Sequence, residues 1–223
     1  MAKNNNLKKE DQANVAEALS KTEQFFEKNK KQIVYTIVGA VVLVALILSY
    51  KAFIVAPKQK EAQNQMFTAE RYFRADSFNL ALNGDGNALG FEKIMSKYGS
   101  KAGAAVYLYA GICELQLGNN DAAIKYLEKY NGKDNIMSAR AKACIGDALV
   151  NKGDIKGAVS YFKDAAKISD NILSAGYLFK AGLCYEELKQ PKEALAVYQQ
   201  IKDNYPQSPE GVEIDKYISR IAE

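Results

Sequence analysis

Three segments of this 223-residue chain share one pattern, and the repetition constrains the fold more than any other feature. The segments align when Gly111, Gly146 and Gly182 are superposed, at spacings of 35 and 36 residues. In each, a helix-forming stretch contains the glycine, a short polar turn follows, and a second helix-forming stretch begins. The turns are Gly118-Asn119-Asn120, Gly153-Asp154 and Lys189-Gln190-Pro191. A helix pair repeated at a fixed period predicts an α-solenoid, in which each pair packs on the next.

Small residues recur within the helix pairs. The second stretch of each segment carries a small residue, followed four positions later by a bulky one. The small residues are Ala123, Ala158 and Ala194, and the bulky ones are Leu127, Phe162 and Tyr198. Glycine inside a helix costs roughly 0.8–1.0 kcal/mol relative to alanine, so its recurrence implies a packing reason. We expect the glycine of the first helix and the alanine of the second to let the two backbones approach.

These units resemble tetratricopeptide repeats. The matching residues are the first-helix glycines Gly111, Gly146 and Gly182, the turn glycines Gly118 and Gly153, the second-helix alanines Ala123, Ala158 and Ala194, the aromatic Phe162 and Tyr198, and the terminal Pro206. The sequence departs from the family pattern at the first-helix tryptophan position, which holds Tyr107, Lys142 and Leu178. The resemblance covers residues 104–207 and implies an all-α array of helix pairs that binds other proteins.

The remaining parts of the C-terminal region extend this array. Residues 58–99 are interpreted as a degenerate unit, with helices at Gln59–Leu82 and Phe91–Tyr98. The link at 83–86, Asn-Gly-Asp-Gly, is interpreted as a structural turn, because the further carboxylates of a calcium loop do not follow it. The expected units of the solenoid at 58–223 are therefore the degenerate unit 58–99, the repeats 104–137, 139–172 and 175–208, and a capping helix at 210–222.

An uncharged apolar run precedes the repeats. Residues 33–50 read IVYTIVGAVVLVALILSY, and AFIVA follows Lys51. A helix over 33–55 would be about 34 Å long, which matches a hydrocarbon core of about 30 Å. A buried core helix rarely carries such a run, and a cleaved signal peptide fits poorly after a polar segment of 32 residues. The sequence predicts an all-α protein in which a single transmembrane helix at 33–55 precedes the solenoid.

Charge suggests an orientation for this helix. Lys28, Lys30 and Lys31 adjoin the apolar run, which favours a cytoplasmic N-terminus, an inner-membrane location and a periplasmic C-terminal domain. Residues 1–57 hold 8 basic and 5 acidic groups, whereas residues 58–223 hold 22 and 21. The repeat domain is therefore almost neutral and lacks the basic surface expected of a nucleic-acid-binding protein.

The N-terminal arm at 1–32 has two parts. Residues 1–11 are polar and expected to be disordered. Residues 12–31 place Val15, Leu19, Thr22 and Phe26 on one stripe, which predicts a short amphipathic helix. Two interpretations stay open: the helix lies on the lipid surface, or it contacts a membrane partner.

The resemblance also implies a groove lined by the first helices. Carried over by repeat position, its residues are Leu108, Ile112, Ala143, Asp147, Phe179, Leu183 and Glu187. The Lys and Asn that clamp a terminal carboxylate in the chaperone-tail subclass are absent at these positions, which excludes that subclass. A largely apolar groove suits extended or helical hydrophobic segments. Alternatively, another helix or a second copy of the chain covers these residues.

Composition argues against catalysis. The chain contains no His, which excludes Ser-His-Asp and Cys-His catalysis and imidazole metal ligands. Cys113, Cys144 and Cys184 are expected to be buried hydrophobic residues. The first-helix carboxylates are interpreted as parts of a solvated face: Glu114, Asp147, Glu186 and Glu187. We expect no enzyme activity, no metal and no cofactor.

The layout of arm, anchor and repeat domain resembles two families of the bacterial envelope. One is the membrane-anchored ancillary subunit of the Sec translocon, and the other is the tetratricopeptide cell-division coordinator family of the Tol-Pal system. The resemblance implies a membrane-inserted scaffold that binds exported polypeptides, translocon subunits or other envelope proteins. The alternative hypothesis is a homo-oligomeric structural anchor whose groove forms its own interface.

Overall fold

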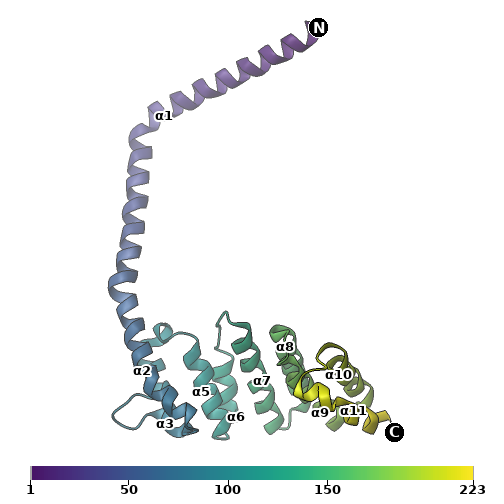
Figure 1. The fold of residues 1–223 in the computed structure, drawn as a ribbon. Coiled ribbons are helices and arrows are strands. Elements are labelled where there is room, and N and C mark those ends of the chain that lie inside the picture. The colour runs from purple at the N-terminus through teal and green to yellow at the C-terminus, as the bar shows by residue number, and fades with distance from the viewer. Residues whose placement is uncertain (1, 223) are drawn as a thin grey trace. The chain divides into compact units, whose positions relative to one another are not determined.

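The computed structural model describes residues 2–222, with side chains described from 25 to 221. All the secondary-structure elements within residues 2–222 are helices, so the expected all-α class is confirmed. The chain divides into two compact units, Met1–Pro57 and Lys58–Glu223 (Figure 1).

The first unit is helical along its length. Helix α1 spans Ala2–Tyr50, and the π-helical turn η1 spans Lys51–Val55. Residues 2–11 belong to α1, so the prediction of disorder there is wrong. The physical reason is that extending a helix that has already nucleated costs little. Of the amphipathic stripe, only Phe26 lies among the described side chains, and it is exposed.

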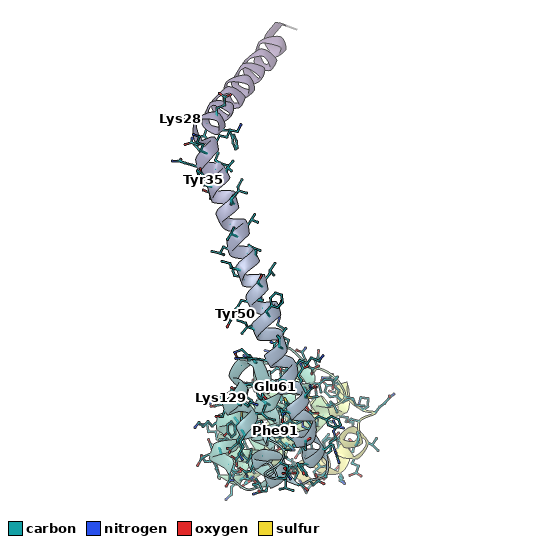
Figure 2. The ribbon with its side chains drawn as sticks, turned by 90° about the vertical axis from the view of Figure 1, so that its left-hand side faces the viewer. Lys28, Tyr35, Tyr50, Glu61, Phe91 and Lys129 are labelled. Carbon is teal, nitrogen blue, oxygen red and sulfur yellow. The ribbon has the colours of Figure 1, made fainter. Side chains whose placement is uncertain are left out.

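The apolar run lies within α1, and none of its side chains is buried. Its side chains project on all sides of the helix between Tyr35 and Tyr50 (Figure 2). By length and composition this helix can cross a membrane, and no residue of its most apolar segment is buried in the protein.

The degenerate unit differs from the prediction in its first helix. Helix α2 spans Ala56–Arg74 and α3 spans Phe78–Asn83, so the single helix expected over Gln59–Leu82 is broken. The chain turns at Asp76, which adopts a left-handed φ of 52°. This turn folds Phe78 back against Phe73, with 5.8 Å between the ring centroids. Helix α4 has the expected bounds, Phe91–Tyr98.

Regular helix pairs follow a 3-10 turn, η2, at Gly99–Ala102. The helices are α5 (Ala105–Gln116), α6 (Asn120–Leu127), α7 (Asn135–Asn151), α8 (Ile155–Ser169), α9 (Ser174–Glu187), α10 (Pro191–Asn204) and α11 (Pro209–Ala222). From α5 to α11 each helix packs mainly against its neighbours in sequence, and α3 packs mainly against α5, so the core is a row of apolar clusters along the array.

The recurring glycines lie against the bulky residues of the second helices. A Cβ atom added to Gly111 would lie 2.5 Å from Leu127 Cγ, and one on Gly146 would lie 2.7 Å from Phe162 Cε1. On Gly182 it would lie 2.1 Å from Tyr198 Cε1. The glycines therefore have a packing role, and their main effect is to make room for a large side chain rather than for the opposing backbone.

The turns within the three repeats share one geometry. Gly118, Gly153 and Lys189 all have left-handed φ angles, of 84°, 81° and 57°. In each case the next N–H donates to a carbonyl five residues earlier, at 2.8–2.9 Å. Lys189 thus adopts a conformation that glycine tolerates better.

Replacing Gly182 by alanine is expected to lower the free energy of unfolding by about 1–3 kcal/mol, because the added methyl group overpacks the contact with Tyr198. Gly176→Ala, in the same helix, is the matched control, since its Cβ would meet only the flexible end of Glu210, at 3.1 Å. Denaturant unfolding of the full chain in detergent, followed by circular dichroism, measures both variants. Equal effects would contradict the packing role.

Replacing Lys189 by glycine is expected to raise the free energy of unfolding by about 1 kcal/mol, because it relieves left-handed backbone strain. The reverse change at the equivalent turn, Gly153→Lys, should lower it by a similar amount. The same unfolding measurement applies. Stabilisation by both substitutions, or by neither, would show that the turn strain is negligible.

Candidate functional site

Three of the predicted groove residues lie in the core. Leu108 and Ile112, of α5, pack with Leu127 and with Ile145 of α7, and they are 3% and 5% exposed. Ala143 is also buried, beside Phe162 and Cys184. These three residues therefore do not line an open groove. The physical reason is that α7 carries alanines at 139, 141 and 143, which let the neighbouring repeats close on both sides of it.

Phe179 is half-buried and packs against the last helix. Its ring meets that of Tyr217, from α11, edge to face at 4.7 Å between centroids, and it also lies 5.9 Å from the ring of Tyr198. This contact agrees with the alternative in which another helix packs on the groove residues, and the groove itself stays a prediction.

The remaining predicted residues form a small accessible surface. Leu183 is 41% exposed and Glu187 is exposed one helical turn later. Nearby on the first helices, the Nζ of Lys180 donates to both carboxylate oxygens of Asp147, at 2.7 and 2.8 Å. The first helices thus present an exposed apolar side chain among charged residues.

Two first-helix carboxylates have structural roles that sequence did not reveal. Glu114 is buried and accepts a hydrogen bond from the Asn119 side chain at 2.8 Å, so its assignment to a solvated face is wrong. Glu186 accepts from the Tyr198 hydroxyl at 2.6 Å, and Arg220 Nη2 lies 2.7 Å from both of its oxygens. Burial and then this carboxylate raise the pKa of Tyr198. Glu186 therefore joins α9 to α10 and α11.

The three cysteines are free, and two of them are buried. Cys113 and Cys184 are buried as expected, and Cys144 is half-buried. Burial is the largest cause that raises their thiol pKa, to about 12 for Cys113 and about 11 for the other two. A thiol nucleophile needs a lowered pKa, so these residues have the opposite environment.

Clefts that sequence did not predict lie along α8. One has a volume of 410 Å³ and is bounded by Val159, Tyr185 and Leu188, and a second has 610 Å³ and reaches Leu178 and Tyr205. They share Lys163 and Asp164. The spacing of Lys156, Lys163 and Lys167 places three cations on one side of α8, and this spacing is the sequence signal for the clefts.

Among the described side chains, 25–221, no three His, Cys, Asp or Glu residues cluster as metal ligands. Two tetratricopeptide repeat family models match the chain, one at residues 105–133 and 177–208 and the other at 139–172. These segments cover α5–α6, most of α9–α10 and most of α7–α8. Among curated proteins, none shows significant similarity to the chain.

The C-terminal unit therefore contains tetratricopeptide repeats, a class of fold that typically serves as a non-enzymatic scaffold for protein–protein interaction. The family models match only the repeat segments of the chain. The resemblance to the translocon and Tol-Pal families stays a prediction.

The thiols are expected to react slowly with iodoacetamide at pH 8, because a pKa of about 11 instead of about 9 lowers the thiolate fraction about 100-fold. Reaction should accelerate as pH rises toward 11. Mass spectrometry of each cysteine peptide, with the denatured chain as control, measures this. Alkylation of Cys184 at the denatured rate at pH 8 would contradict its burial.

Proposed function

We propose that the protein is a membrane-anchored scaffold that holds other proteins beside the membrane. The observation that carries this proposal is an apolar helix without a buried face in the same chain as an array of tetratricopeptide repeats. Exposure of so much apolar surface to water is unfavourable by about 25 cal/mol per Å², whereas lipid accommodates a helix of this length. The anchor raises the effective concentration of the repeats near membrane partners.

The partner surface in this proposal is the accessible part of the first helices. Leu183 offers an apolar contact, and the exposed carboxylate of Glu187 offers an acceptor beside it. Asp147 and Lys180 neutralise each other, so they fix the surface without adding net charge. A segment that inserts an apolar side chain next to a basic one fits this arrangement.

We further propose an envelope role, with a cytoplasmic N-terminus, a periplasmic repeat domain, and exported polypeptides, translocon subunits or other envelope proteins as partners. The lysines at 28, 30 and 31 support this orientation through the positive-inside rule. The competing arrangement is a homo-oligomeric anchor, in which the same surface binds a second copy of the chain instead of another protein.

A photo-crosslinking amino acid that replaces Leu183 in the full chain, produced in bacteria, is expected to capture a defined partner at the membrane. The control carries the same amino acid in place of Gln199, which is exposed on α10 away from the first helices. Mass spectrometry identifies the products, and Glu187→Lys should reduce capture at Leu183. Equal capture from both positions would refute the partner surface, and capture of the chain alone would favour the homo-oligomer.

A further inference from the structure

The first helix of every unit begins at the same edge of the solenoid. Glu61, near the start of α2, accepts hydrogen bonds from Lys97 and Tyr98 at the end of α4. Tyr72, near the end of α2, donates to Asp85, which precedes α4. These contacts make α2 and α4 antiparallel, and each later helix reverses direction again, so α5, α7 and α9 begin where α2 begins (Figure 1).

We name this the proximal edge and define it by the residues at the ends of these helices. It consists of residues 58–61, 97–102, 128–140, 166–174 and 202–210. Lys58, where the chain enters the repeat domain, therefore lies on the proximal edge.

Two pairs of large apolar side chains are exposed on the proximal edge. Ile136 and Met137, at the start of α7, are 46% and 40% exposed, and Ile172 and Leu173, just before α9, are 54% and 47% exposed. The pairs are 36 residues apart, the same spacing as Gly146 and Gly182, so they occupy one position in adjacent repeats. Single exposed apolar residues are ordinary, but a pair repeated where two first helices begin is typical of a contact surface.

Hydrogen bonds hold both pairs in ordered turns. The Met137 N–H donates to Asp134 Oδ1 at 2.8 Å, and the Leu173 N–H donates to Asn171 Oδ1 at 2.9 Å. Ser174 Oγ donates to the Ala166 carbonyl, also at 2.9 Å, and ties the second turn to α8. The apolar side chains are thus presented by fixed backbone, which limits the entropy lost when they are buried by a partner.

The proximal edge is also the basic part of the repeat domain. Its residues include nine Lys or Arg and six Asp or Glu, a net charge of +3, whereas the whole of 58–223 has 22 and 21, a net charge of +1. The rest of the domain therefore carries −2. Lys129, one of these basic residues, lies near the level of Glu61 in Figure 2.

We propose that the proximal edge rests on a lipid surface containing anionic headgroups, with the two apolar pairs in the headgroup region. Apolar tips within a basic surface match the chemistry of an anionic bilayer interface. The inference rests on the proposed function, because the anchor would deliver the chain to Lys58 directly from a membrane. A protein partner would not require the apolar pairs to lie on the edge at which the chain enters the domain.

The absence of Trp from the chain allows a direct test, because one introduced Trp is the only indole fluorophore. The variants are Ile172→Trp and Ile136→Trp in the full chain, reconstituted in phosphatidylcholine–phosphatidylglycerol vesicles with brominated acyl chains. Leu117→Trp is the matched control, since Leu117 is an exposed apolar residue (38%) in the α5–α6 turn at the opposite edge. Circular dichroism verifies that each variant folds.

We expect brominated lipids to remove about half of the emission at positions 136 and 172, since interfacial residues lie about 5–10 Å into the headgroup boundary. Emission at position 117 should not change. In the Ile136→Trp chain, Leu173→Asp should reduce the quenching, which shows that the edge and not the new Trp drives contact. Equal quenching at position 117 would overturn the proposal.

Leu43→Trp, within the apolar run, distinguishes a failure of the membrane anchor from a failure of the docking of the proximal edge. If its emission is quenched and that of Ile172→Trp is not, the anchor stands and the docking of the proximal edge is wrong. If neither is quenched, the proposed membrane anchor is wrong as well. A blue shift at position 172 without quenching would mean that a protein covers the edge, which also overturns lipid docking.

Discussion

The repeat array depends on one contact, between a glycine of the first helix and a bulky side chain of the second. At Gly182 this contact admits the ring of Tyr198, which is fully buried. The hydroxyl of that ring then reaches Glu186, and Glu186 in turn holds Arg220 of the last helix. The position of the capping helix, and with it the cover over Phe179, thus follows from the space that a missing methyl group leaves.

Close packing between repeats determines which surfaces remain for partners. Alanines on α7 draw the first and third repeats inward, so most of the apolar residues expected to line a groove complete the core instead. The apolar side chains that stay exposed on the repeats are few, and the structure gives them distinct surroundings. Leu183 lies among charges on the first helices, whereas the pairs at 136–137 and 172–173 lie where α7 and α9 begin, on a basic edge.

Local patterns in the sequence predicted local structure well. The glycine–alanine spacing predicted the helix pairs, and the uncharged run predicted the long apolar helix. The break at Asp76 was missed because a left-handed turn at a non-glycine residue has little sequence signal. Burial of Leu108 and Ile112 was missed because it depends on how closely α7 approaches, which is set by residues in the next repeat and not by periodicity within one helix. Glu186 was missed for a similar reason, since its partner Arg220 lies 34 residues further along the chain.

The stacking of each helix on its neighbours has a consequence for how the domain forms. Nearly all of its contacts join elements adjacent in sequence, so little chain must be closed into loops before a contact is made. Domains rich in local contacts fold quickly, and arrays of this kind can nucleate in one unit and propagate to the next. The repeats can therefore assemble in order as the polypeptide emerges, and the C-terminal helix, which packs against the ring of Phe179, completes the process.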